Sequence, residues 1–272
     1  MNRECFLLIL MLIFVFPFKV KGDIVTNRKR TDGFGSQLEE IVYTAVYAEL
    51  TNNTFVYTPI TEMEHNYDND PSFLKKKEWL MNICRYVPIN TDLALYERCS
   101  RHHVFRFFHD NIEKSARSIS VQKIKEYFRA NKNPGMVFQK ARFNIAMHVR
   151  RPNRQDIRIY GPDIPDDDYI NILKKLRSRY NNKNPLFHIC SQGDIEDFKK
   201  KFPGDDIELC INASIEETFM KMVFSDVLVS TASALSYVAG WLSEGEVYYI
   251  PFQDHEPFPW WINVKTLMED DL

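Results

Sequence analysis

The chain has 272 residues, which is enough for one large domain or for two domains of moderate size. Its formal net charge of -2 excludes a general attraction to nucleic acid or to an anionic membrane, so any phosphate binding has to be local. A hydrophobic content of 44% and a charged content of 26% are ordinary for a globular protein. We therefore expect a globular protein without a nucleic-acid partner.

The N-terminus carries a targeting signal. Arg3 precedes an uninterrupted apolar run from Phe6 to Phe18, which is shorter than the roughly 20 residues that span a bilayer. Val20-Lys21-Gly22 then offers a cleavage point. We predict that residues 1–22 are a signal peptide, with an uncleaved anchor as the alternative. The expected location is the secretory pathway (endoplasmic reticulum or Golgi lumen) or outside the cell, with membrane contact only through an anchor.

Removal of this segment leaves Cys84, Cys99, Cys190 and Cys210. Cys190 and Cys210 end two successive predicted strands, so they are candidate neighbours. A disulfide and two buried free thiols are both open for this pair. Because no CxxC pair or Cys/His metal spacing occurs, we predict no structural zinc.

The first element is a short strand at Asp23-Ile24-Val25-Thr26. A glycine loop, Asp32-Gly33-Phe34-Gly35-Ser36-Gln37, then leads into a helix that extends to Leu50, because apolar residues recur at steps of three and four. Strand, glycine loop and helix bring backbone N–H groups close to an anion; a simple tight turn is the alternative. Gly33 and Gly35 lack the full dinucleotide spacing, so no Rossmann cofactor site is indicated.

A second strand is predicted over Thr54–Ile60, where β-branched and aromatic residues alternate. The polar loop that follows contains Glu64, His65 and Asn66. Because functional residues concentrate on loops at strand ends, we predict an acceptor- or donor-contact segment here, with a solvated loop as the alternative. Pro71 opens a helix predicted over residues 72–87.

The stretch from Asn90 to Gly135 is less regular. A strand is predicted over Asp92–Glu97 and a helix over Asp110–Asn131. Arg101-His102-His103 is a poor metal candidate, because adjacent side chains diverge and no suitable ligand spacing supports it. Asn131–Gly135 has the composition of a turn or linker, so the domain boundary is placed close to it.

From Arg142 onward strands and helices alternate. Strands are predicted at 144–149, 186–190, 206–211, 226–230 and 246–251, and helices at 165–180, 194–202, 214–224 and 233–242. Alternation at these lengths predicts an α/β fold with a parallel sheet wrapped by helices.

Three loops fall at the carboxyl edge of that sheet, where open α/β folds bind ligands. They are Arg150-Arg151-Pro152-Asn153, Ser191-Gln192-Gly193-Asp194 and Ser230-Thr231-Ala232-Ser233-Ala234. Two adjacent guanidiniums suit a phosphate or a pyrophosphate, and hydroxyl side chains at a strand-to-helix junction suit the same group. Solvated arginines and ordinary helix capping are the alternatives. Together the loops favour a nucleoside diphosphate as the ligand.

Two acceptor patterns for N-glycosylation occur, at Asn52 and Asn212. Asn212 follows a strand that ends at the predicted ligand edge, where a glycan would obstruct binding. We therefore predict that Asn212 is unmodified.

His148-Val149-Arg150-Arg151 resembles the His-x-Arg-Arg-Gly-Asp element of GDP-fucose-dependent fucosyltransferases, in the α-1,2/α-1,6 and protein O-fucosyltransferase superfamily. The resemblance covers most of the chain from Asp23 to Phe252. Further segments resemble the fucosyltransferase-like proteins of large DNA viruses: Asp32–Gln37, Glu64–Asn66, Ser191-Gln192 and Asp226–Ser236.

This resemblance implies two facing Rossmann-like domains in the GT-B arrangement. Residues 23–138 would form an N-terminal acceptor-side α/β domain, and residues 139–272 a C-terminal nucleotide-sugar-binding domain. It implies a metal-independent, inverting glycosyltransferase that moves fucose from GDP-fucose to a hydroxyl of a glycan or glycoprotein. No cofactor is expected, because the nucleotide sugar is itself the donor substrate.

The resemblance also implies roles for individual residues. Arg150 would contact the donor pyrophosphate and stabilise the departing GDP, since a fixed guanidinium aimed at developing negative charge is a preorganised electrostatic catalyst. Asp32 would be the base that takes the acceptor proton, with Glu64 as the second choice. The remaining donor-binding residues would be Gly33, Gly35, His148, Arg151, Ser191, Gln192, Ser230, Thr231 and Ser233.

One departure from the family pattern affects the function. The Gly-Asp of the family element is replaced by Pro152-Asn153, so no role of that aspartate carries over. Two alternatives follow: a transferase of another sugar, and a non-catalytic protein that binds a glycan or nucleotide sugar on the same scaffold.

Overall fold

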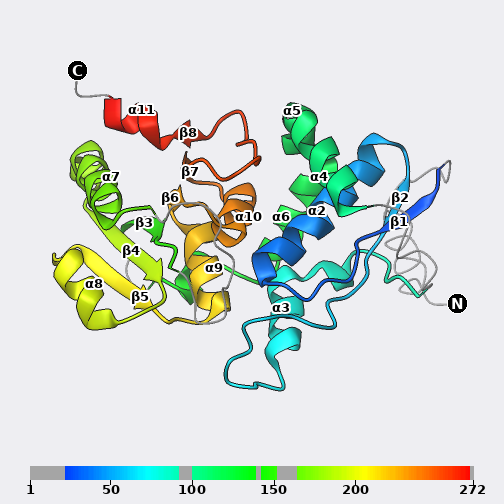
Figure 1. Ribbon diagram of the computed structural model, residues 1–272, viewed down its shortest axis with the longest axis horizontal. Helices are drawn as coiled ribbons and strands as arrows, with labels where there is room; N and C mark the ends of the chain where they lie inside the picture. Colours follow the sequence, from blue (N-terminus) through cyan, green and yellow to red (C-terminus); the bar gives the residue numbers. More distant parts are fainter. Residues whose placement is uncertain (1–21, 92–99, 139–141, 152–163, 270–272) are drawn as a thin grey trace, which may run out of the picture.

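The computed structural model describes residues 22–91, 100–138, 142–151 and 164–269 (Figure 1). Within these ranges the strands form two sheets, one of two strands and one of six. Every pairing between the named strands is parallel. The predicted α/β class and parallel sheet are confirmed.

The larger sheet has the spatial order β5-β4-β3-β6-β7-β8. Its strands are β3 (Phe143–His148), β4 (Pro185–Ser191), β5 (Ile207–Ile211), β6 (Val227–Ser230), β7 (Glu246–Tyr249) and β8 (Ile262–Asn263). The chain winds outward from β3 to β5 and then returns to the other side of β3 to begin β6. This reversal, between β3 and β6, is the switch point at which doubly wound sheets bind ligands.

Successive residues of a strand point to opposite faces of the sheet. Because both faces carry buried apolar side chains, helices cover both. Ile145 and Met147 belong to a buried cluster with residues of α7 (Asp166–Arg179), α8 (Ile195–Lys201) and α11 (Val264–Glu269). Ala146 belongs to the cluster on the other face, with residues of α9 (Ile215–Phe224) and α10 (Ala234–Leu242). The sheet is thus the middle layer of the C-terminal half.

The described N-terminal half is mainly helical. Its two strands are β1 (Ile24–Thr26) and β2 (Thr54–Val56). Its α-helices are α2 (Phe34–Leu50), α3 (Phe73–Met81), α4 (Arg101–Asp110), α5 (Ile112–Ala116) and α6 (Ile119–Arg129). Short 3-10 turns are η1 (Ile83–Arg85), η3 (Pro134–Met136) and, in the C-terminal half, η4 (Asn181–Lys183).

Helix α2 packs the N-terminal half against the C-terminal half. In Figure 1, α9 and α10 lie between the six-stranded sheet and the N-terminal helices. The ring centroids of Phe34 and Phe219 are 5.2 Å apart, and those of Tyr43 and Trp241 are 5.5 Å apart. One buried hydrophobic cluster therefore continues from α2 and α6 through α9 and α10 to the sheet. The two-domain division near residue 138 stays a prediction.

Most of the predicted elements of the C-terminal half are confirmed to within a few residues. Ser214 is the N-cap of α9, as predicted, and its side chain accepts a hydrogen bond from the Glu217 backbone N–H. The sequence did not predict β8 and α11, which follow the last predicted strand.

The N-terminal predictions were less accurate. The helix predicted over 110–131 is divided into α5 and α6, because Ser118 caps a new helix by accepting from the Val121 N–H. The sequence did not predict α4, which Ser100 caps in the same way. The second strand ends at Val56, four residues earlier than predicted. The strand predicted over 92–97 lies outside the described residues.

Among the described residues, no helix has the length and apolar character needed to cross a membrane. Residues 1–21, which contain the predicted signal, lie outside that part of the chain.

Candidate functional site

A cavity opens at the carboxyl ends of β3 and β4, beside the switch point of the sheet. The loops after β3 and β4, the starts of α2, α9 and α10, and His65 surround it. Its described lining residues are Gly33, Phe34, Gly35, Ser36, His65, His148, Val149, Arg150, Arg151, Ser191, Gln192, Ala213, Ile215, Thr218, Ser233, Ala234 and Leu235. None of these residues is acidic, which suits an anionic ligand.

Two of the three helix N-termini at the cavity, those of α2 and α10, carry no acidic residue in the first turn, whereas α9 carries Glu216 and Glu217 there. Acids also occupy the first turns of α7 and α8. Because the backbone N–H groups of a first turn have no partner inside the helix, a turn without acids remains available to an external anion.

The arginine pair lines this cavity, as predicted. Arg150 is exposed and lies on the cavity wall. Arg151 forms an ion pair with Asp166, and its guanidinium lies 5.4 Å from the centroid of the Phe198 ring. Asp166 also pairs with Lys201 at 2.8 Å. Arg151 is thus held in one orientation by α7 and α8, whereas Arg150 lies at the exposed side of the wall.

His148 ends β3 beside the arginines. Its Nδ1 is buried and makes no hydrogen bond within the described part of the chain. Burial, together with the nearby charge of Arg150, lowers the pKa of His148 to about 3. The imidazole is therefore neutral at physiological pH and presents no additional positive charge to a ligand.

The hydroxyl residues after β6 divide into two groups. Ser233 lines the cavity at the N-cap of α10, and its side chain makes no capping hydrogen bond. Ser230 and Thr231 do not line it. The Ser230 hydroxyl donates to Ser236 Oγ at 3.3 Å, and Thr231 Oγ1 lies 2.7 Å from the Tyr169 hydroxyl. Both side chains are fully buried, so this structure does not place their hydroxyls at a ligand.

The loop after β4 is fixed by internal hydrogen bonds. Ser191 Oγ donates to the Val149 carbonyl at 2.6 Å, which ties the end of β4 to the end of β3. Asn212 donates to the Gly193 carbonyl at 2.8 Å and accepts from the Gly193 N–H at 2.9 Å. Ser191 and Gln192 both line the cavity, but the Ser191 hydroxyl already serves a structural bond.

The two predicted glycines have different surroundings. A Cβ on Gly33 would lie 3.0 Å from His65 Nε2, so Gly33 permits the approach of that histidine. A Cβ on Gly35 would lie 2.4 Å from the Leu235 backbone nitrogen. We expected Gly35 to admit a donor molecule. The structure shows that Gly35 lines the cavity and that its missing side chain admits the backbone of α10.

The predicted base and its alternative lie outside the cavity lining. Both Asp32 oxygens face the Arg30 guanidinium, with Arg30 Nε at 2.8 Å from Oδ1. Glu64 is exposed. Asn66 closes a local turn through two hydrogen bonds to the Asp70 backbone. In the loop that contains Glu64 and Asn66, only His65 reaches the cavity wall, and its Nδ1 lies 2.7 Å from the Tyr67 hydroxyl.

Several lining residues were missed by the sequence analysis. They come from the start of α9, namely Ala213, Ile215 and Thr218. The N-cap signal at Ser214 marked the start of that helix correctly. The N-cap signal could not show that the start of α9 lies beside the loops after β3 and β4, because this neighbourhood depends on the spatial order of the strands.

Searches of family models and of curated proteins found no match. Among solved structures, the chain is similar to the fucosyltransferase NodZ from Bradyrhizobium, with 15% identity, coverage of 85% of this chain and 96% of that chain, and a TM-score of 0.41. It is also similar to POFUT1 in complex with GDP-fucose, with 12% identity, coverage of 85% and 98%, and a TM-score of 0.45. For the E. coli heptosyltransferase WaaC with ADP, the identity is 11%, the coverage 92% and 98%, and the TM-score 0.45. Likenesses of this degree assign neither a family nor a substrate.

Proposed function

We propose that this protein is a glycosyltransferase that binds the diphosphate of a nucleotide sugar in the cavity beside β3 and β4. The observation that carries the proposal is the meeting of Arg150 with the acid-free N-termini of α2 and α10 on one cavity wall. This arrangement lies at the switch point of a parallel sheet, where nucleotide ligands bind in such folds.

The chemistry of sugar transfer matches these groups. Breaking the bond between the sugar and the diphosphate leaves negative charge on the departing phosphate oxygens. Arg150 and the N–H groups of α2 and α10 would stabilise that charge, which lowers the barrier. In this proposal no metal is required, and the donor is a substrate rather than a cofactor.

The finer proposal is inverting transfer of fucose from GDP-fucose to a hydroxyl of a glycan or glycoprotein. It rests on the resemblance of the His148–Arg151 element and the Asp32–Gln37 loop to fucosyltransferases. The proposal keeps Asp32 as the base, and its carboxylate has to leave Arg30 before it accepts a proton.

A donor assay tests the proposal. The protein is incubated with GDP-fucose, and released GDP is measured with and without glycan acceptors. We expect turnover that falls at least about a hundredfold in Arg150→Ala, because a preorganised donor for the developing charge contributes on the order of 10²–10³ in rate. Arg106→Ala, which removes an exposed arginine on α4 outside the cavity lining, is the matched control and should keep full turnover.

A second candidate is a protein that binds a nucleotide sugar or glycan without turnover. The pairing of Asp32 with Arg30 and the lack of an acidic residue among the described lining residues favour it. The same assay separates the two candidates. Saturable GDP binding without turnover of any donor in a panel of GDP- and UDP-sugars would support the second candidate. Turnover of a donor other than GDP-fucose would instead show that the enzyme transfers another sugar.

A further inference from the structure

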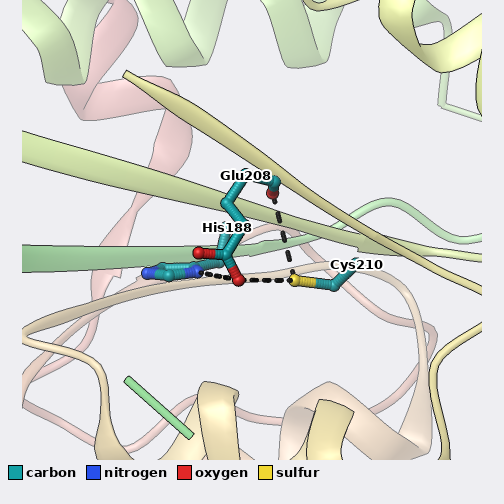
Figure 2. A group of neighbouring side chains, drawn as sticks. All are labelled: His188, Glu208 and Cys210. Atoms are coloured by element: carbon teal, nitrogen blue, oxygen red, sulfur yellow. Dashed lines mark hydrogen bonds and ion pairs between the residues drawn. The ribbon is translucent and has the colours of Figure 1, made fainter. Parts of the chain in front are cut away.

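A second cluster of reactive side chains lies on β4 and β5, and its members are not among the residues that line the cavity. His188 on β4 and Glu208 and Cys210 on β5 point to the same face (Figure 2). His188 Nδ1 lies 3.4 Å from Glu208 Oε1, and one ligand-type atom from each of the three residues lies within 4.8 Å of the others. Cys190 and Cys210 were predicted to be neighbours, and the structure pairs them in register as buried free thiols. The sequence did not indicate that His188 and Glu208 lie beside Cys210.

Lys221 of α9 supplies the positive charge of the cluster. Its Nζ lies 2.5 Å from Glu208 Oε1, 3.0 Å from Cys210 Sγ and 3.2 Å from Glu217 Oε1. Burial alone would lower the pKa of Lys221, but its bonds to Glu208 and Cys210 raise it above the ordinary value. The ammonium is therefore charged, and it stabilises a thiolate on Cys210.

Cys190 lies directly beside Cys210. The two residues are register partners on adjacent parallel strands, so their side chains point to the same face, where Cys210 Sγ meets Lys221 of α9; both thiols are buried. Paired strands are about 4.8 Å apart, which is within the Cα separations that a disulfide spans. The neighbouring Cys190 thiol, together with His188 and Lys221, lowers the pKa of Cys210 against the opposing effect of burial, while the same neighbour and burial raise the pKa of Cys190. The pKa of Cys84 shifts in the opposite direction to that of Cys210. Cys84 is an exposed residue, but partial burial of its thiol raises the pKa of that group.

A divalent metal is the other ligand that a histidine, a glutamate and a cysteine suggest. The position of Lys221 argues against it, because its ammonium already lies against both Glu208 and Cys210. A metal bound by these groups would have to displace a buried cation. The contacts therefore favour a thiolate over a metal ligand.

We propose that Cys210 is a site of oxidation by hydroperoxides and that Cys190 resolves the product into a disulfide. The Cys210 thiolate attacks one peroxide oxygen, the O–O bond breaks, and the leaving oxygen takes up a proton. Cys210 becomes a sulfenic acid, oxidised by two electrons, while the peroxide is reduced to water or an alcohol. The Cys190 sulfur then attacks the Cys210 sulfur, and the released hydroxide takes the Cys190 proton as water.

The position of this pair links it to the cavity. Cys190 directly precedes Ser191, whose hydroxyl ties β4 to β3, and Cys210 lies two residues before Asn212, which holds Gly193. A disulfide between them would fix the β4–β5 pair at the base of the loop that carries Gln192. The proposal does not depend on the function assigned to the cavity.

The test follows oxidation of the full chain by hydrogen peroxide at pH 6. Reduced, chelator-treated protein is exposed to peroxide with and without dimedone, which traps sulfenic acids, and peptides are assigned by mass spectrometry. We expect a Cys190–Cys210 linked peptide in the wild type and a dimedone adduct on Cys210 in Cys190→Ser. Cys84 should react at least about tenfold more slowly, because little of its thiol is ionised at this pH.

Two further variants test the origin of the reactivity. Lys221→Met should slow oxidation of Cys210 about tenfold at pH 6, whereas Lys221→Arg, which keeps a cation, should restore most of the rate. Thermal unfolding of each variant confirms that the fold persists. The proposal is overturned if Cys84 is oxidised before Cys210, or if the sulfenic acid accumulates in the wild type without a linked peptide. It also fails if Cys210 in protein prepared without chelator resists peroxide until a chelator removes a bound metal.

Discussion

Neighbouring hydroxyl residues in the loop after β6 have different surroundings, although the sequence shows them as one group. Thr231 is fully buried and contacts the Tyr169 hydroxyl, whereas Ser233 lies on the cavity wall without a capping bond. Residue type and loop position predicted a ligand-binding loop here, and in the structure Ser233 and Ala234 of this loop line the cavity. They could not show which hydroxyls face the cavity, because that depends on the partners that Tyr169 and Ser236 supply from elsewhere in the fold.

This difference predicts opposite effects of two substitutions. Thr231→Val should lower the free energy of unfolding by about 1 kcal/mol, because it removes one buried hydrogen bond to the Tyr169 hydroxyl, and should change nucleotide affinity little. Ser233→Ala should weaken binding of a nucleoside diphosphate several-fold and leave stability nearly unchanged. Urea unfolding measures the stability of both variants, and calorimetric titration measures their affinity. Weaker binding in Thr231→Val with unchanged binding in Ser233→Ala would show that Thr231, and not Ser233, contacts the nucleotide.

His109, like His148, is a residue from which we expect a pH dependence of stability. It is buried, its Nδ1 accepts a hydrogen bond from the Glu256 N–H at 3.0 Å, and its Nε2 lies 3.2 Å from the Tyr43 hydroxyl. Burial, with a smaller effect of His255, lowers the pKa of His109 to about 3. The folded state therefore keeps this imidazole neutral, while the unfolded chain protonates it below its ordinary pKa of about 6.5.

Stability should consequently be lost as the pH falls below about 6.5 toward 3, where the unfolded state binds the additional proton. Between pH 7 and pH 5 this residue should account for a loss of about 2 kcal/mol in the free energy of unfolding. In His109→Gln that part of the decline should disappear. Urea unfolding at both pH values measures it, and equal declines in the two proteins would show that His109 is charged in the folded state.

The contact between the starts of α2 and α10 is the feature that shapes the cavity. Because Gly35 has no side chain, these helices approach so closely that both N-termini line the same cavity. Helix α2 was predicted from its apolar periodicity, and the glycine loop before it, predicted to bind a donor, lines the cavity. The partner of Gly35 was not predictable, since Leu235 is two hundred residues away and only the packed structure brings it near.

Substitution of this glycine should disrupt that contact. Gly35→Ala would place a Cβ 2.4 Å from the Leu235 backbone nitrogen, so the helices have to separate. We expect a loss of about 1–3 kcal/mol in the free energy of unfolding, as for an overpacked core, together with weaker nucleotide binding. Gly135→Ala is the control, because its Cβ would meet only the Asn133 side-chain oxygen, at 3.1 Å. Similar effects of both substitutions would contradict the role given to this contact.

For the whole molecule, the continuous core between the two halves has a consequence for unfolding. Strand and helix alternation predicted the parallel sheet well, because each buried strand and each amphipathic helix carries its own local pattern. The mainly helical N-terminal half was predicted less well, since caps at Ser100 and Ser118 divide an otherwise weak periodicity. No local pattern indicates that Phe34 and Tyr43 pack against Phe219 and Trp241.

Because these aromatic contacts join the two halves of the protein, we expect the two halves to unfold together. Differential scanning calorimetry should show one transition in which the calorimetric and van't Hoff enthalpies agree. Two separated transitions, or a calorimetric enthalpy well above the van't Hoff value, would show instead that the halves are independent domains.

The proposed function requires that the cavity beside β3 and β4 bind the diphosphate group of a nucleotide. Calorimetric titration with guanosine, GMP and GDP measures whether it does. We predict that GDP binds at least about tenfold more tightly than GMP, since charge-assisted hydrogen bonds contribute about 1.5–3 kcal/mol each. Arg150→Ala should remove most of this difference, and Arg106→Ala should preserve it. Equal affinity for the nucleoside and both nucleotides, or a diphosphate preference that survives in Arg150→Ala, would contradict the account.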